Sequence, residues 1–143
     1  MIRIKEKLHK QCMVYVNERI VTAQQAINSA RESANDDTKS SAGDKYETGR
    51  EMMQQEIDRN REQLDEAKRL KFDLEQIKPL KITENVQNGS IVSTNYGKFY
   101  IGISRGQIIM NGRNYFAISA LSPIGSKLLN KKQILSSILI ERS

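Results

Sequence analysis

An apolar seam at helical spacing runs through residues 2–34, and no glycine or proline interrupts it. Its residues are Met13, Val16, Ile20, Ala23, Ile27, Ala30 and Ala34, with Ile4 and Leu8 extending it toward the start. The steps alternate between three and four residues, which is typical of a helix that packs along another helix. The pattern therefore predicts one long helix with a narrow buried face.

A second seam follows, and it ends before Pro79. Its residues are Met53, Ile57, Asn60, Leu64, Ala67, Leu70 or Lys71, Leu74 and Ile77. Pro79 stops this helix, because proline lacks an amide proton and disfavours helical geometry in the residue before it. Two helices of roughly 33 residues would each be about 50 Å long. A short connection makes such helices antiparallel neighbours, so residues 1–78 are predicted to form an antiparallel two-helix coiled coil.

The connection between the two seams, residues 35–44, is polar and rich in carboxylates. We expect residues 35–37 to end the first helix, and Gly43 tolerates a positive φ. Asp44 is a suitable N-cap for the second helix, and Glu47 three residues later completes a capping box. Helix caps and turns therefore explain the acids of this connection just as well as a functional role would.

Beyond Pro79 the apolar spacing changes to that of short strands. The expected strands are residues 89–94, 98–103, 107–110 and 115–119. Asn111-Gly112 is a strong hairpin signal, and Ser122-Pro123 is a typical start for a short helix over residues 124–129. Residues 79–143 are therefore predicted to form a small strand-rich α+β domain that leans on the base of the hairpin, because so few residues can bury only a small core.

Cysteine and histidine usage excludes several classes of site. The single cysteine, Cys12, cannot form an intramolecular disulfide, and with His9 as the only histidine a zinc site or a Ser-His-Asp triad lacks parts. We expect a solvated His9 and a half-buried Cys12 rather than a metal site. No apolar run approaches the roughly 20 residues of a membrane span, and the N-terminus does not resemble a secretory signal, so we expect a cytoplasmic protein that does not enter membranes.

The net charge of +6 is unevenly distributed along the sequence. Residues 1–78 hold 15 Lys and Arg against 15 Asp and Glu, whereas residues 79–143 hold 8 against 2. The basic residues of the second part include Lys98, Arg105, Arg113, Lys127, Lys131 and Lys132. A solvated surface and a nucleic-acid patch are both compatible with this pattern.

Two strings resemble a known family. Residues 118–132, ISALSPIGSKLLNKK, and the segment Asp44-Lys45-Tyr46-Glu47 resemble the Gre family of bacterial transcription elongation factors. The resemblance implies an N-terminal antiparallel coiled coil joined to a C-terminal domain of FKBP-like fold, and it covers essentially the whole chain.

The resemblance also implies a function. Gre factors insert their coiled coil into the secondary channel of RNA polymerase, where acids at its tip help to hold a catalytic Mg²⁺ while the polymerase cleaves backtracked RNA. The chain would then be no enzyme itself, would have no cofactor of its own, and would share Mg²⁺ with the polymerase. The acids near this tip that we expect to act are Asp37 first, then Asp36 and Asp44. The residues expected to contact polymerase or RNA are Lys39, Ser40, Ser41, Ser122, Pro123, Lys131 and Lys132.

Two alternative functions stay open, and the first arises because this sequence departs from the family pattern at the hairpin tip. The family pattern Asp-x-x-Glu-Asn-x-x-Tyr, aligned on Tyr46, places Lys39 and Ala42 at its acids and Gly43 at its Asn. These departures favour a channel-binding inhibitor or modulator that cleaves nothing. A structural adaptor, with a helical hairpin for another coiled coil and a basic module for nascent RNA or DNA, is the alternative from a different class. We expect a monomer if the two seams pack within one chain.

Overall fold

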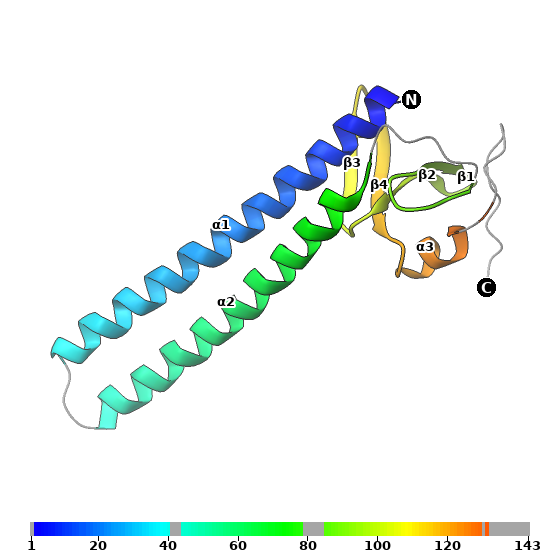
Figure 1. The fold of residues 1–143 in the computed structure, drawn as a ribbon. Coiled ribbons are helices and arrows are strands. Elements are labelled where there is room, and N and C mark those ends of the chain that lie inside the picture. Colours follow the sequence, from blue (N-terminus) through cyan, green and yellow to red (C-terminus); the bar gives the residue numbers. More distant parts are fainter. Residues whose placement is uncertain (1, 41–43, 79–84, 130, 132–143) are drawn as a thin grey trace. The chain divides into compact units, whose positions relative to one another are not determined.

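The chain has an α+β fold in which two long helices precede a four-stranded sheet and a short helix (Figure 1). The computed structural model describes residues 2–40, 44–78, 85–129 and 131, and within the long helices the side chains of residues 4–33 and 49–78. The elements are α1 (Ile2–Ser40), α2 (Asp44–Gln76), β1 (Ile91–Thr94), β2 (Gly97–Gly102), β3 (Gly106–Met110), β4 (Arg113–Ser119) and α3 (Pro123–Leu128).

The chain divides into two compact units, and the division falls within the long helices. The sheet unit comprises Met1–Tyr15 and Phe72–Ser143, so it includes the first turns of α1 and the last turn of α2. The hairpin unit comprises Val16–Lys71, which is the remainder of both helices and their connection. The small sheet thus shares a unit with the base of the helices.

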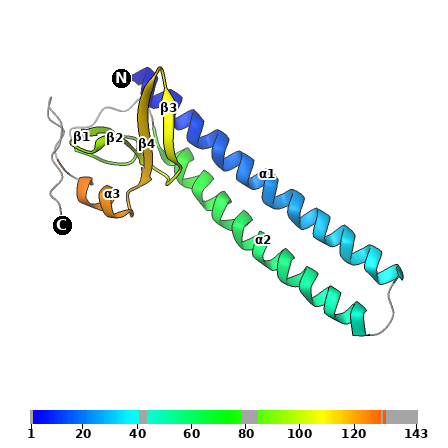
Figure 2. The same cartoon turned by 180° about the vertical axis from the view of Figure 1, so that it is seen from behind.

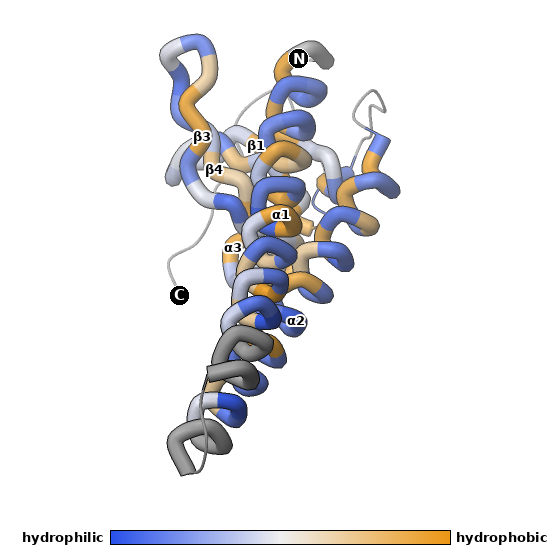
Figure 3. Tube along the Cα trace, turned by 90° about the vertical axis from the view of Figure 1, so that its left-hand side faces the viewer, coloured by the Kyte–Doolittle hydropathy of each residue, from blue (hydrophilic) through white to orange (hydrophobic). Residues whose placement is uncertain are grey.

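In the hairpin unit α1 and α2 lie side by side and run antiparallel (Figure 1). Their shared core contains Ala23, Ile27, Ala30, Ile57 and Leu64, with Ile20 packed against it. Hydrophilic and hydrophobic residues alternate along both helices, as their amphipathic packing requires (Figure 3). The described residues contain no helix long and apolar enough to cross a membrane.

The first helix is longer than the sequence predicts. Residues 35–40, expected to form part of the connection, continue α1 as far as Ser40. Asn, Asp, Thr and Ser lower helix propensity by less than about 0.7 kcal/mol each relative to Ala, whereas glycine and proline are much stronger breakers. No glycine or proline occurs before Gly43, so the helix propagates through this polar segment.

The sheet is mixed and has the strand order β1-β2-β4-β3 (Figure 2). Antiparallel hairpins join β1 to β2 and β3 to β4, and the second confirms the turn predicted at Asn111-Gly112. In the second hairpin Asn111 and Gly112 have φ values of 52° and 75°, the left-handed geometry that a two-residue turn requires. The central pair, β2 and β4, is parallel, and no sequence signal indicated it.

Two different layers cover the two faces of the sheet. One face packs with α3 in a core of Val86, Val92, Phe99, Ile101 and Leu128. Successive residues of a strand point to opposite faces, so Tyr100 faces the other way. A side chain added at Gly102 would meet Tyr100, Leu74 and Ile77, and the last two residues belong to α2 and its end. The second face is therefore closed by the base of the long helices.

We predict that Ile27→Ala destabilises the hairpin unit by about 2–4 kcal/mol, because a fully buried aliphatic side chain leaves a cavity when truncated. Ile27 is 2% exposed in the helix–helix core. The measurement is chemical denaturation followed by far-UV circular dichroism.

Val21→Ala is the matched control, because Val21 lies on the same helix and is 53% exposed. Its expected effect is within about 0.5 kcal/mol. Equal losses of stability in the two variants would contradict the observed seam.

Candidate functional site

The three acids predicted to act at the hairpin end lie near the end of α1 and at the start of α2. Asp36 and Asp37 occupy the last two turns of α1, and Asp44 is the first residue of α2. Lys39 and Ser40 end α1, while Ser41 lies outside the described residues. The side chains of residues 34–40 and 44–48 are also outside the described part, so convergence of the three carboxylates on one ion stays a prediction.

The backbone alone fixes how these acids relate to the helix dipoles. The C-terminal end of a helix carries a partial negative charge, so acids there are unfavourable by about 0.3–1 kcal/mol, whereas acids at an N-terminus are favourable. Asp44 begins α2 and is therefore stabilising, but Asp36 and Asp37 lie at the C-terminal end of α1. Helix capping, one of the two explanations offered by the sequence, fits Asp44 and does not fit Asp36 or Asp37.

Ser122 and Pro123 start α3 as predicted. The Ser122 hydroxyl accepts a hydrogen bond from the Gly125 amide at 3.0 Å and donates one to the Ser119 carbonyl at 2.6 Å. Pro123 is the first helical residue, where its missing amide proton costs nothing. A Cβ at Gly125 would collide with the Ser119 carbonyl oxygen, so this turn is closely packed. Both residues thus have a clear structural role, and their contact with polymerase stays a prediction.

Lys131 is exposed just after α3, and its backbone forms hydrogen bonds with Val86 and with Leu128. The Val86 amide donates to the Lys131 carbonyl at 2.7 Å, and the Lys131 amide donates to the Leu128 carbonyl at 3.0 Å. Lys132 lies outside the described residues. The ammonium of Lys131 therefore remains available to a partner.

A polar cluster that sequence analysis did not find lies between α1 and the sheet, within the sheet unit. His9 Nδ1 and the Tyr100 hydroxyl share a hydrogen bond at 3.2 Å, with a direction that depends on the histidine tautomer. Tyr100 is fully buried, and burial raises its pKa, so the phenol stays protonated. Burial lowers the pKa of His9, so the imidazole stays neutral. This pair contradicts the solvated His9 expected from the sequence, because the sheet covers that side of α1.

Cys12 is buried next to the same pair. Burial raises the pKa of its thiol to about 11, and the nearby charge of Arg105 opposes this shift. A thiol held in its neutral form is a poor nucleophile. The sequence predicts a half-buried Cys12, whereas the residue is fully buried in the packed base of α1. The cluster is therefore a buried junction between helix and sheet, with no activated group for catalysis.

A shallow groove lies at the end of α2. Two adjoining hollows of about 360 Å³ and 310 Å³ share Asp73, Gln76, Ile77 and Asn88 in their walls. Neutral amides and one carboxylate dominate this shared lining. Ser90 lines one hollow and Ser119 the other, and Asp73 is the one carboxylate of the shared lining, with no histidine or cysteine among the lining residues of either hollow.

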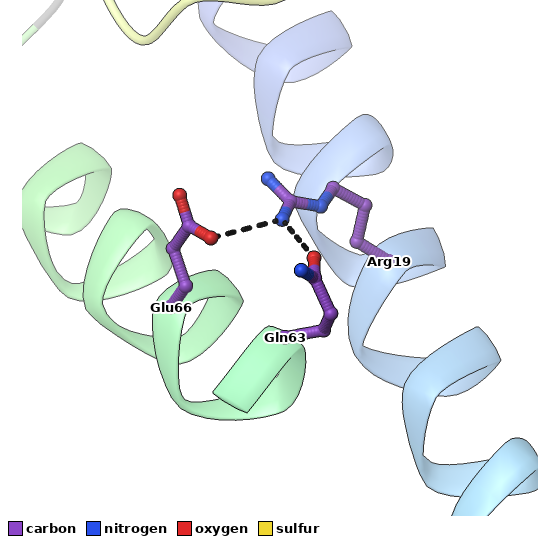
Figure 4. Close-up of polar contacts among 3 residues, drawn as sticks. All are labelled: Arg19, Gln63 and Glu66. Carbon is purple, nitrogen blue, oxygen red and sulfur yellow. Dashed lines mark hydrogen bonds and ion pairs between the residues drawn. The ribbon is translucent and has the colours of Figure 1, made fainter. Parts of the chain in front are cut away.

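In the hairpin unit Arg19 links the two helices (Figure 4). Its Nη2 donates to Gln63 Oε1 at 3.2 Å and lies 3.7 Å from a carboxylate oxygen of Glu66. Partly exposed pairs of this kind contribute about 0–1 kcal/mol. The contact adds a weak polar link beside the apolar core of the two helices.

Within the described ranges no group of three or more His, Cys, Asp or Glu residues could hold a metal ion. Comparison with family models, with curated proteins and with solved structures finds no match to the chain. The hairpin end thus remains the candidate functional site on the strength of its own residues and their place in the fold.

We predict that acid weakens the folded state through His9, the only histidine of the chain. Burial lowers its pKa from 6.5, so below pH 6.5 the unfolded chain takes up a proton that the folded chain resists. Stability should therefore fall as the pH drops through 6.5 and level off below the folded pKa. Denaturant unfolding across this range measures the effect.

His9→Gln is the control, because it removes the titrating group while keeping a polar side chain. This variant should lose the component of the pH dependence that sets in near pH 6.5. An NMR titration of the single imidazole gives the folded pKa directly. A midpoint at or above 6.5 would show that burial does not govern this residue.

Proposed function

We propose that the chain is a Gre-like transcription factor that binds bacterial RNA polymerase and places the end of its helical hairpin in the secondary channel. The order of its elements supports this function, since two long helices precede a small sheet with a short Ser-Pro-capped helix. In this proposal the hairpin corresponds to the Gre coiled coil and the sheet domain to the FKBP-like domain. The working location is the cytoplasm.

The observation that carries the proposal is the position of Asp36 and Asp37 within α1. Carboxylates there oppose the helix dipole, so local stability does not account for them. Three residues separate Ser40 from Asp44, so the Cα atoms of these two residues lie at most about 14 Å apart. Asp36, Asp37 and Asp44 are thus gathered at one end of the hairpin.

Carboxylate oxygens at this position fit a role with Mg²⁺. Mg²⁺ prefers hard oxygen ligands and is often bound by one or two carboxylates together with substrate phosphates. In the proposed complex the acids would help to hold an ion of the polymerase active centre, and that ion would activate the water that cleaves backtracked RNA. The chain would supply ligands only, and the polymerase would remain the enzyme.

Other predicted contacts have matching roles in this proposal. Lys39, Ser40 and Ser41 would approach RNA phosphates or polymerase loops, because cations and hydroxyls are common phosphate partners. Ser122, Pro123, Lys131 and Lys132 would dock the sheet domain at the channel rim. The exposed position of Lys131 supports its part in this contact.

The packing of the hairpin disfavours the coiled-coil adaptor. The seam residues Ile27, Ile57 and Leu64 pack together within one chain, and Val16 and Ala67 are fully buried. A hairpin whose apolar stripe is already covered does not need a helix from another protein. A monomeric arm that reaches into a channel is the simpler use of such a hairpin.

One observation favours a second candidate, a channel-binding modulator without cleavage activity. Lys39 and Ala42 stand at the two positions where the Gre pattern has acids. A lysine cannot ligate Mg²⁺ as a carboxylate does, and its charge repels the ion. In this candidate the hairpin end blocks or reshapes the active centre.

We predict that Asp36→Ala/Asp37→Ala abolishes stimulated RNA cleavage while binding to core polymerase is retained. The physical reason is loss of the oxygen ligands at the end of α1. The measurement is cleavage of labelled RNA in backtracked complexes, with pull-down on purified core polymerase as the binding assay.

Glu62→Ala/Asp65→Ala is the matched control, because it removes two exposed acids from the middle of α2. This control should leave cleavage unchanged. Full cleavage by the Asp36/Asp37 variant would end the catalytic role of these acids. Polymerase binding without cleavage by the wild-type chain would select the modulator, and absence of binding would reject both candidates.

A further inference from the structure

Charge is divided between the two compact units more sharply than between the halves of the sequence. The sheet unit carries 13 Lys and Arg against 5 Asp and Glu, whereas the hairpin unit carries 10 against 12. The first turns of α1 contribute to this division, because Lys5, Lys7 and Lys10 belong to the sheet unit. The positive charge of the protein is therefore concentrated in one body.

The strand-bearing part of this unit contains no carboxylate side chain. Residues 85–140 include neither Asp nor Glu. The cations in its described part, residues 85–129 and 131, are Lys98, Arg105, Arg113, Lys127 and Lys131. None of these five is paired with a carboxylate within the described ranges, whereas Arg19 and Arg59 of the hairpin unit are paired with Glu66 and Glu56.

Two of these cations contact uncharged groups, so their positive charge is not neutralised. The Lys98 ammonium lies 5.9 Å from the ring centroid of Tyr115, and the Arg105 guanidinium lies 5.6 Å from that of Tyr15. Arg105 also donates from Nη1 to the Gln107 carbonyl at 2.9 Å. Aromatic rings and carbonyls hold a cation without neutralising it. The field around the sheet thus remains positive.

The exposed residues around the remaining cations are neutral hydrogen-bonding groups. Arg113 follows the exposed turn Asn111-Gly112 and precedes exposed Asn114. The turn between β3 and β4 is hydrophilic (Figure 3). Lys127 and Lys131 are exposed and lie four residues apart. Cations interspersed with amides are the usual partners of phosphate oxygens.

A protein partner fits this surface less well. Stable protein interfaces have an apolar core inside a polar rim. In the described strand-bearing part the large exposed apolar side chains are Tyr96, Ile109 and Leu121, far fewer than the roughly 20–30 residues that one side of a typical interface contributes. Tyr96 can also stack on a base. The surface therefore favours nucleic acid.

We propose that the sheet unit binds the phosphodiester backbone of RNA or DNA without reading its sequence, through Arg113 at the start of β4 and through Lys127 and Lys131, which follow the other end of β4 in and after α3. Each contact displaces counterions from the nucleic acid, so affinity falls as salt rises. This binding does not rest on the polymerase proposal, because it needs no other protein.

The test is fluorescence anisotropy with labelled duplex DNA and, separately, single-stranded RNA of one sequence, across a salt series without polymerase. Arg113→Gln/Lys127→Gln/Lys131→Gln should weaken binding at least about tenfold at roughly 100 mM salt, and the log–log salt slope for duplex DNA should become shallower by about 0.9 per lost phosphate contact. The two probes distinguish duplex from single-stranded backbone as the preferred source of phosphate.

Arg61→Gln/Lys68→Gln/Arg69→Gln is the matched control, because it removes the same charge from exposed positions of the hairpin unit. This control should bind as the wild type does. A second variant, Arg113→Lys/Lys127→Arg/Lys131→Arg, keeps the charge and should retain affinity. Far-UV circular dichroism checks that each variant is folded.

Three results would overturn the proposal. They are absence of binding by the wild-type chain even at low salt, equal losses in the two neutralised variants, and binding of poly-glutamate as tight as that of nucleic acid. The wild-type salt slope is informative without any variant, and a slope near zero would exclude phosphate contacts.

Discussion

A four-stranded sheet has two faces to bury, and in this protein its own short helix covers only one of them. Helix α3 has six residues and closes the face that holds Phe99 and Ile101. The opposite face, with Tyr100, is closed by the base of α1 and the end of α2. Burying an aliphatic side chain such as Leu8 or Leu74 stabilises the fold by about 1.5–3 kcal/mol. The sheet therefore depends on the long helices to bury its second face.

This dependence explains where polar groups become buried. The base of α1 brings half-buried His9 and buried Cys12 under the sheet, where Tyr100 shares a hydrogen bond with His9 and the charge of Arg105 partly opposes the rise in the pKa of the Cys12 thiol. The His9–Tyr100 pair is satisfied by its own hydrogen bond, as buried polar groups usually are, whereas Arg105 Nε is buried without a hydrogen-bond partner among the described residues. It also explains why the compact units divide within the helices at residues 15 and 72 rather than at Pro79.

Local patterns predicted most of the elements, and long-range contacts account for what they missed. The seams predicted both helices, Asn111-Gly112 predicted the β3–β4 hairpin, and Ser122-Pro123 predicted the cap of α3. The contact between His9 and Tyr100 joins residues 91 positions apart, and one sequence carries no signal for such a pair. The sequence predicts too early an end for α1, because its polar residues 35–40 resemble a turn although each is only mildly unfavourable in a helix. For the candidate site, the sequence identified the acids, whereas their positions relative to the helix dipoles became clear only from the bounds of α1 and α2.

The opposite charges of the two units have a consequence for how the chain could meet nucleic acid. A hairpin unit with more acids than bases is repelled by phosphates, whereas the sheet unit attracts them. In the proposed complex, the carboxylates of Asp36 and Asp37 would approach an RNA phosphate with a cation between the two sets of oxygens. A divalent ion in a polymerase active centre would be such a cation. It would offset the negative charge of the phosphate and that of the acids at the C-terminal end of α1. Attraction at the sheet and ion-dependent contact at the hairpin end are therefore separable properties, each set by the residues of its own unit.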